Sequence, residues 1–174
     1  MVLFLGMKYA VLAYVPIQEK LLMMKKGTRE NDPNSTYNTA PGGKIELYEM
    51  GFNPVGRLEA VVREIKQETG LILLNPIWRG VVLFDNENRI FPGNKRMDNY
   101  TVYAFYADMF KGKMKKGTEE GIPCLVDTKD ISNLPQNPGD PLMYEWIKDG
   151  RFFVGVIKYD AESVNEAETW VDFV

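Results

Sequence analysis

The sequence predicts one α/β domain in which a mixed β-sheet packs against helices. The chain has 174 residues, 45% of them apolar and 26% charged, which is the usual size and composition of a single globular domain. Short apolar and aromatic runs recur between Gly, Pro and Asn residues, as expected for strands. One longer run, at 54–69, carries apolar residues at helical spacing. Because we find no internal repeat or linker, we expect a single domain over residues 1–174.

The N-terminal third is expected to form strands and loops. Residues 7–15 and 20–25 are typical of two strands joined by a turn around 16–19, and the apolar start of the chain is expected at an edge of the sheet. The polar run 26–39 predicts a long loop, which either faces a substrate or is simply surface.

The helix at 54–69 has clear start and stop signals. Asn53 is a good N-cap, Pro54 suits the first helical position and Gly70 suits the position after the last turn. The apolar stripe expected to face the core consists of Val55, Leu58, Val62 and Ile65.

The rest of the chain continues the α/β pattern. In order, we expect strands at 77–84 and 99–109 joined by a polar, exposed loop, a strand at 123–128, a Pro/Asn/Gly turn, a helix near 142–149 and a strand at 152–158.

Composition excludes several functions. The net charge of −3 provides no global field for nucleic acid or acidic membranes, and no apolar run has transmembrane length. The sequence has no His, which removes imidazole ligands and Ser–His or Cys–His nucleophiles. Cys124 is the single cysteine, so no internal disulfide can form, and we expect a cytoplasmic location with Cys124 packed in the core. Chemistry must therefore use carboxylates, amides, Lys, Arg, Tyr or a metal ion.

A cluster of polar residues lies on the predicted helix, opposite its apolar stripe. Glu64 and Glu68 are i,i+4 neighbours, with Gln67 between them. Two like charges at this spacing cost roughly 0.2–0.5 kcal/mol in a bare helix. The cluster is either a solvated helix face or a site for a hard divalent cation, which prefers oxygen ligands.

The surrounding residues resemble the signature of the Nudix hydrolase family, G-x5-E-x7-R-E-U-x-E-E-x-G-U, where U is a bulky apolar residue. The residues that match are Gly43, Glu49, Arg63, Glu64, Ile65, Glu68, Gly70 and Leu71. Two departures stand out. Thirteen residues separate Glu49 from Arg63 instead of seven, and Gln67 replaces the first Glu of the E-E pair.

This resemblance implies a Nudix α/β/α sandwich with a mixed β-sheet and a loop-helix-loop catalytic motif. It also implies that Glu64, Glu68, Glu120 and the backbone carbonyl of Gly42 bind Mg²⁺, with Mn²⁺ as a substitute. Arg63 would orient the carboxylates by pairing with Glu49. The catalytic base would be Glu120, Glu68 or the acid missing at Gln67, since an amide cannot act as a base.

The resemblance is closest to the MutT-like branch of the family, which hydrolyses nucleoside triphosphates. Lys25, at the end of the second strand, and Lys44 would then contact phosphate, although both suit a solvated surface equally. Asn38 would contact the base, although an Asn in a turn needs no function. Asp140 keeps one of two acids that read the base edge in the branch, whereas Asn137 and Gly139 replace a stacking Trp and the other acid. Glu119 is the alternative to Glu120 in this alignment.

We therefore expect Mg²⁺-dependent hydrolysis of a nucleoside triphosphate, an oxidised purine dNTP such as 8-oxo-dGTP being one candidate, to the monophosphate and pyrophosphate. ADP-ribose or a dinucleoside polyphosphate is the alternative substrate within the family. A catalytically impaired nucleotide-binding protein is the alternative of another class. The expected partner is a small nucleotide, with no nucleic acid and no membrane, and the sequence leaves a homodimer open.

Overall fold

The computed structural model describes residues 7–27, 37–50, 54–90 and 97–174. The predicted N-cap Asn53, the apolar residues 1–6 and most of the predicted loop at 26–39 lie outside these residues. The elements are β1 (Met7–Tyr14), β2 (Pro16–Ile17), β3 (Lys20–Lys26), β4 (Asn38–Thr39), β5 (Gly42–Lys44), the 3₁₀-helix η1 (Leu47–Glu49), α1 (Pro54–Thr69), β6 (Leu71–Leu74), β7 (Ile77–Arg89), β8 (Asn99–Tyr106), β9 (Met109–Gly112), β10 (Gly121–Asp127), the 3₁₀-helix η2 (Thr128–Asn133), α2 (Asp140–Asp149), β11 (Phe153–Ala161), β12 (Ser163–Val164) and β13 (Trp170–Phe173).

The central sheet is mixed, as the sequence predicts. Its strands run in the order β12-β11-β7-β8-β1-β5, and β13 adds to β11. The pairs β1–β8 and β11–β7 are parallel, whereas β7–β8 and β1–β5 are antiparallel. The strand β1 lies between β8 and β5, so the expectation that this segment forms an edge of the sheet was wrong. A smaller sheet, β10-β3-β2 with β4 beside β3, and the pair β6–β9 complete the fold.

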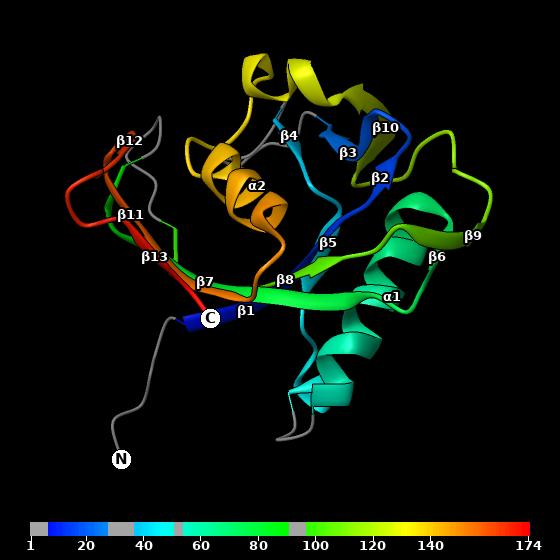
Figure 1. Cartoon of the computed structure of the whole chain (residues 1–174), viewed down its shortest axis with the longest axis horizontal. Helices are drawn as coiled ribbons and strands as arrows, with labels where there is room; N and C mark the ends of the chain where they lie inside the picture. The colour runs from blue at the N-terminus through cyan, green and yellow to red at the C-terminus, as the bar shows by residue number, and fades with distance from the viewer. Residues whose placement is uncertain (1–6, 28–36, 51–53, 91–96) are drawn as a thin grey trace.

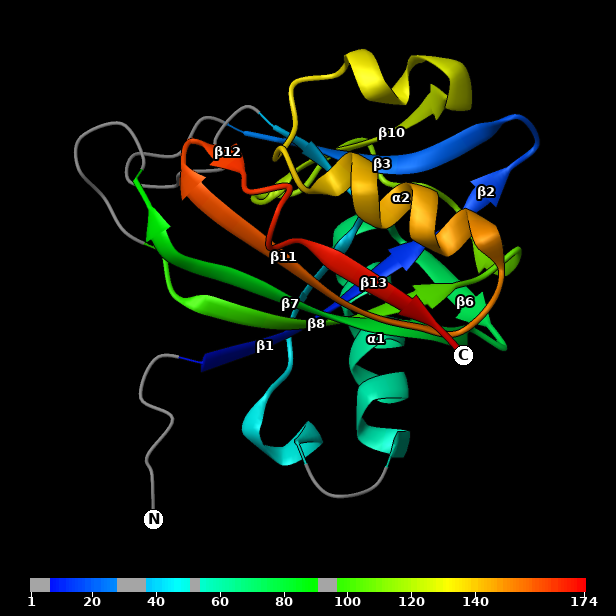
Figure 2. The same ribbon diagram turned by 60° about the vertical axis from the view of Figure 1, so that its left-hand side comes forward.

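Helices cover both faces of the central sheet, which gives the predicted α/β/α sandwich (Figures 1 and 2). Alternate residues of a strand point to opposite faces, so β1 serves both cores. Val11 and Ala13 pack with Val61 and Ile65 of α1. On the other face, Met143 and Trp146 of α2 pack with residues of β7, β8 and β11. Burial of these two apolar layers stabilises the arrangement.

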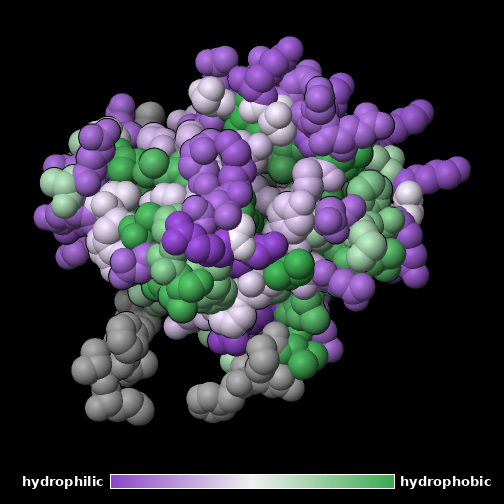
Figure 3. Space-filling view, viewed as in Figure 1, coloured by the Kyte–Doolittle hydropathy of each residue, from purple (hydrophilic) through white to green (hydrophobic). Residues whose placement is uncertain are grey.

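The helix α1 is rotated relative to the sequence prediction. Of the expected stripe, Ile65 is buried, but Val55 and Leu58 are 47% and 37% exposed. Figure 3 shows hydrophobic residues at the surface in the region of η1 and α1. The side that faces the sheet consists of Ala60, Val61, Glu64, Ile65 and Glu68. The prediction that the carboxylates lie opposite the buried face was therefore wrong.

The strand β7 is longer than expected. Residues 85–89, assigned from sequence to an exposed loop, continue the strand and pair with β11, where Ala161 lies opposite Arg89. Asn86 and Arg89 are buried. The polarity of this run suggested a loop, but its side chains have partners inside the protein, and a hydrogen-bonded polar group can be buried. The pairs β6–β9 and β11–β13 contain strands that were not predicted either.

Candidate active site

A cavity of about 670 Å³ opens between α1, the central sheet and the start of α2. One part of it is bordered by charged groups: Lys26, Lys44, Arg63, Glu64 and Glu120. Another part is bordered by apolar, aromatic and polar side chains: Ala10, Leu12, Phe84, Tyr100, Val102, Asn86, Arg89, Asn137, Asp140 and Tyr159. This is the volume range of small-molecule sites, which are commonly apolar with a few placed polar groups.

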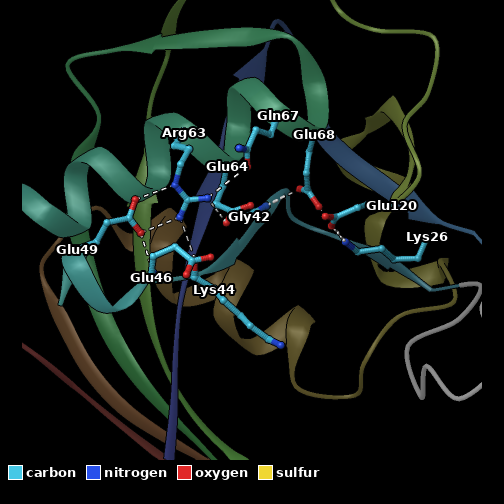
Figure 4. A network of polar contacts seen from close by, with 10 residues as sticks. All are labelled: Lys26, Gly42, Lys44, Glu46, Glu49, Arg63, Glu64, Gln67, Glu68 and Glu120. Carbon is cyan, nitrogen blue, oxygen red and sulfur yellow. Dashed lines mark hydrogen bonds and ion pairs between the residues drawn. The ribbon is translucent and has the colours of Figure 1, made fainter.

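Arg63 is the centre of the hydrogen-bond network at the charged part (Figure 4). Its Nε and Nη2 donate to the two carboxylate oxygens of Glu49 at 2.8 and 2.7 Å. Its Nη1 donates to Glu64 Oε1 at 2.7 Å and to Gln67 Oε1 at 3.3 Å. Its Nη2 also donates to the carbonyl of Lys44 at 3.1 Å. The expected pairing of Arg63 with Glu49 is present, and the same guanidinium also holds Glu64.

Glu49 is a buried anion whose charge is compensated. It is 2% exposed, and its second oxygen also accepts the backbone N–H of Glu46 at 2.8 Å. The hydrogen bonds from Arg63 hold the pKa of Glu49 below its ordinary value, despite burial. The same bonds raise the pKa of Arg63. Both groups therefore stay charged at neutral pH, and the η1 segment is tied to α1.

Glu68 is the most enclosed carboxylate of the cluster. It is 2% exposed; its Oε2 accepts the N–H of Gly42 at 2.8 Å and its Oε1 accepts Lys26 Nζ at 2.9 Å. Burial, together with a smaller effect of the nearby Glu120, raises the pKa of Glu68 to about 7 against the opposing attraction of Lys26. Such a group can take up or release a proton near neutral pH.

The carboxylate of Glu64 lies beside Gly43 of β5. It is 8% exposed, and burial raises its pKa although Arg63 opposes this. A Cβ at Gly43 would lie 2.4 Å from Glu64 Oε2, so a side chain at this position would collide with the carboxylate. Gly43 therefore lets β5 pass directly beside the carboxylate of Glu64 without displacing it.

Glu120 comes from the turn before β10 and is brought to the cluster only by the fold. Its carboxylate lies 3.6 Å from Lys26 Nζ and is half exposed. Figure 4 shows its carboxyl group close to that of Glu68. Glu120 borders the cavity, and Glu119 does not.

The described residues do not include three acidic or Cys side chains that converge closely enough to hold a metal ion. Glu64 and Glu68 are instead paired with Arg63 and Lys26. The kind of donor set nevertheless suits a hard divalent cation, because carboxylates crowd here in a partly desolvated place and a cation relieves their repulsion. The assignment of Glu64, Glu68, Glu120 and the carbonyl of Gly42 as metal ligands stays a prediction.

The fold brings two of the four predicted substrate residues to the cavity, Lys44 and Asp140. Lys25 is exposed and does not border it; the next residue, Lys26, does. Neighbouring residues of a strand point to opposite sides, so Lys26 and not Lys25 is the lysine at the end of β3 that borders the cavity. Asn38 is also outside the cavity: it is buried in β4, and its backbone N–H and Nδ2 both donate to the carbonyl of Pro135, at 2.7 and 3.1 Å.

The polar group beside the apolar part of the cavity was only partly foreseen. Asp140 is partly buried, but its Oδ2 atom is fully buried and has no hydrogen-bond partner within the described part of the chain. Burial raises its pKa to about 7, against the attraction of Arg89. Arg89 donates to Asn137 Oδ1 at 3.0 Å and to Asn86 Oδ1 at 3.4 Å, and its guanidinium carbon lies 3.9 Å from the centre of the Tyr159 ring.

Sequence reasoning missed Arg89 and Asn86. A signal for Asn86 was present, because the alternation of buried residues at 80, 82 and 84 continues to 86. Arg89 carried no comparable signal.

In the part of the chain that the structure describes, no helix combines the length and apolar content needed to cross a membrane.

Comparison with known proteins gives consistent relationships. The model of the NUDIX domain matches residues 7–147. An uncharacterised Nudix hydrolase of Bacillus subtilis, YvcI, is 30% identical over 145 residues, which are 83% of this chain and 82% of that protein.

Two solved structures show the same fold. A MutT protein from Bacillus halodurans superposes with a TM-score of 0.73 at 24% identity, covering 95% of this chain and 97% of its own. The NUDIX domain of Shewanella oneidensis NrtR, solved in complex with ADP ribose, superposes with a TM-score of 0.65 at 14% identity, covering 84% of this chain and 90% of its own.

Proposed function

This chain belongs to the Nudix hydrolase family, and we propose that it hydrolyses a nucleoside triphosphate to the monophosphate and pyrophosphate with the aid of Mg²⁺. Enzymes of this family act on phosphoric anhydrides. The observation that carries the proposal is the cavity itself, in which a cluster of carboxylates and lysines adjoins an apolar, aromatic part with a buried acceptor. This combination suits a ligand that has a phosphate chain at one end and a base at the other.

In this proposal Glu64, Glu68, Glu120 and the carbonyl of Gly42 hold the ion, with Mn²⁺ able to replace Mg²⁺. A bound ion supplies charge neutralisation at the phosphates and a lowered pKa of the attacking water. Arg63 holds Glu64 and Glu49 in place, a role that its four partners support.

Glu68 or Glu120 accepts the proton of the attacking water. Glu68 is the preferred candidate, because it is the buried carboxylate at which Gly42, Lys26 and Glu120 meet. Gln67 can accept hydrogen bonds, but it cannot take this proton, so we expect activity below that of a chain with Glu at this position.

The nucleobase of the substrate is proposed to lie beside Phe84 and Tyr100, where its edge reaches Asp140. The unpartnered Oδ2 of Asp140 is a buried acceptor, or a donor when protonated, and it can pair with the edge of a purine. An oxidised purine dNTP such as 8-oxo-dGTP is the first substrate to test.

ADP-ribose and a dinucleoside polyphosphate are the second candidates. The NUDIX domain of NrtR, which has the same fold, was solved in complex with ADP ribose. The signature concerns the diphosphate of the substrate and leaves the attached groups to other parts of the chain.

We also propose that the whole chain, 1–174, forms a single domain around this site.

The test is release of pyrophosphate and phosphate with Mg²⁺ from dNTPs, 8-oxo-dGTP, ADP-ribose and a dinucleoside polyphosphate. The Gln67→Glu variant is assayed in parallel. Release of pyrophosphate from one or a few triphosphates supports the proposal and identifies the preferred nucleobase. Cleavage confined to ADP-ribose or a dinucleotide overturns the substrate, whereas silence of both proteins with nucleotide still bound overturns hydrolysis.

A further inference from the structure

Lys26 is the positive charge that the Glu68 and Glu120 carboxylates share. Its Nζ lies 2.9 Å from Glu68 Oε1 and 3.6 Å from Glu120 Oε2 (Figure 4). The side chain of Glu68 is 1% exposed and that of Lys26 is 19% exposed, so this pair is largely shielded from water. Arg63, the other cation of the network, is bonded to Glu49 and Glu64 instead.

The two oxygens of Glu68 are not equivalent. Oε2 accepts the N–H of Gly42 at 2.8 Å, a contact set by the backbone of β5. Oε1 accepts a hydrogen bond from Lys26 Nζ at 2.9 Å. Any cation that binds Glu68 through Oε1 must therefore displace Lys26 or share the oxygen with it.

The side chain of Lys26 can change its position while its backbone stays in place. Its backbone is fixed, because it is the last residue of β3 and pairs with Gly121 of β10. Its ammonium group sits at the end of a flexible four-carbon stem. Once released from Glu68, an ammonium group in this partly buried place needs another anion, since an unpaired charge there is costly. Lys26 borders the same cavity as Lys44 and Glu120, so its ammonium group can pair with an anionic ligand that binds in this cavity.

We propose that Lys26 is an exchangeable counter-ion: it holds Glu68 and Glu120 together in the resting protein, yields Glu68 to a divalent cation, and then pairs with a phosphate of the ligand. The inference rests on the proposed function for the presence of a cation and a phosphate. It adds that the lysine and the cation compete for one carboxylate oxygen, which couples metal binding to phosphate binding.

The test measures Mn²⁺ binding to the protein without nucleotide, by electron paramagnetic resonance at about pH 8.5, where the carboxylates are ionised. Lys26→Met is expected to bind Mn²⁺ about tenfold more tightly than the parent chain, because one charged hydrogen bond no longer has to be broken. Lys26→Arg keeps the competing charge and should stay close to the parent. Lys25→Met is the matched control, because this neighbour is exposed and outside the cavity.

The second measurement is the affinity for inorganic pyrophosphate at saturating Mn²⁺. Here Lys26→Met should bind about tenfold more weakly than the parent, since the lysine is missing as a phosphate partner. The two expected effects have opposite signs, which a loss of folding cannot produce. Unchanged or weaker Mn²⁺ binding, or unchanged pyrophosphate binding, in Lys26→Met overturns the inference.

Failure of this inference is distinguishable from failure of the proposed function. If the parent chain binds neither Mn²⁺ nor pyrophosphate and hydrolyses nothing, the proposed function fails, and the counter-ion role fails with it. If the parent binds both and turns over substrate, but Lys26→Met behaves like Lys25→Met, only the counter-ion role is wrong.

Discussion

Replacing Arg63 with Met should destabilise the protein by about 3 kcal/mol, at the lower end of the 3–5 kcal/mol typical for breaking a buried ion pair. Arg63 donates two hydrogen bonds to Glu49, which is 2% exposed, and further bonds to Glu64, Gln67 and Lys44. Without the guanidinium, Glu49 keeps the hydrogen bond from the backbone N–H of Glu46 but becomes an uncompensated buried charge. The lower end applies because the side chain of Arg63 is 23% exposed, so water screens part of the interaction.

The assay is urea denaturation at pH 7, followed by circular dichroism and without added metal. Arg151→Met is the matched control, because Arg151 also binds one carboxylate, Asp149, through two nitrogens, but on the exposed surface. We expect its free energy of unfolding to stay close to that of the parent chain. A loss of less than about 1 kcal/mol for Arg63→Met, the range of an exposed pair, would refute the reasoning.

The pH dependence gives a second check on the same pair. Arg63 holds the pKa of Glu49 below the ordinary value of 4.5, so this contribution to stability is present above pH 4.5 and is lost as the pH falls through the folded-state pKa. The difference between the parent chain and Arg63→Met should therefore shrink from pH 7 to about pH 3. A difference that is constant over this range would mean that the ionised Glu49 is not the partner that matters.

Three further predictions concern the site. Glu68→Gln should lower kcat by about 10²–10⁴-fold, because it removes the proposed base and a proposed ligand; full turnover in a steady-state assay would show that this helix is not the catalytic element. The pKa of Asp140 is raised from 3.8 to about 7 in the folded protein, so the parent chain loses stability as the pH rises through 7. Asp140→Asn removes this carboxyl group, and its free energy of unfolding should therefore exceed that of the parent by more at pH 8 than at pH 5. Equal differences at the two pH values in urea denaturation would contradict this. Gly43→Ala should lower both the melting temperature and kcat/KM, since its Cβ would lie 2.4 Å from Glu64 Oε2, and unchanged values would show that β5 does not need this close approach.

Local sequence signals were sufficient for much of the fold. The strands β1, β3, β8, β10 and β11 were predicted near their observed positions, because runs of apolar and aromatic residues between turn residues report local conformation directly. Pro54 and Gly70 likewise delimit α1, since both act through their own backbone. Short strands such as β12 and β13 were missed because they depend on pairing with β11.

Faces and partners were the main source of error. The helix prediction placed Glu64 and Glu68 opposite the buried face, whereas hydrogen bonds from Arg63, Gly42 and Lys26 allow their burial. A hydrophobic pattern cannot anticipate this, because the partners come from distant parts of the chain. For the same reason the residues around Arg89 resembled a loop until their contacts with Asn137 and Tyr159 were in place.

The sequence by itself determined the family, the mixed α/β class and the residues of the signature helix, because these depend on residue types at fixed spacing. Only the tertiary structure decided which lysine meets the carboxylates: Lys26 reaches Glu68 across 42 positions of sequence, while Lys25 points away. It also decided that Glu120 joins the cluster and that Asp140 is left with an unpartnered oxygen within the described chain. Charge, burial and pKa arise from groups that are close in space, and closeness in space is set by how the strands pair and the layers pack.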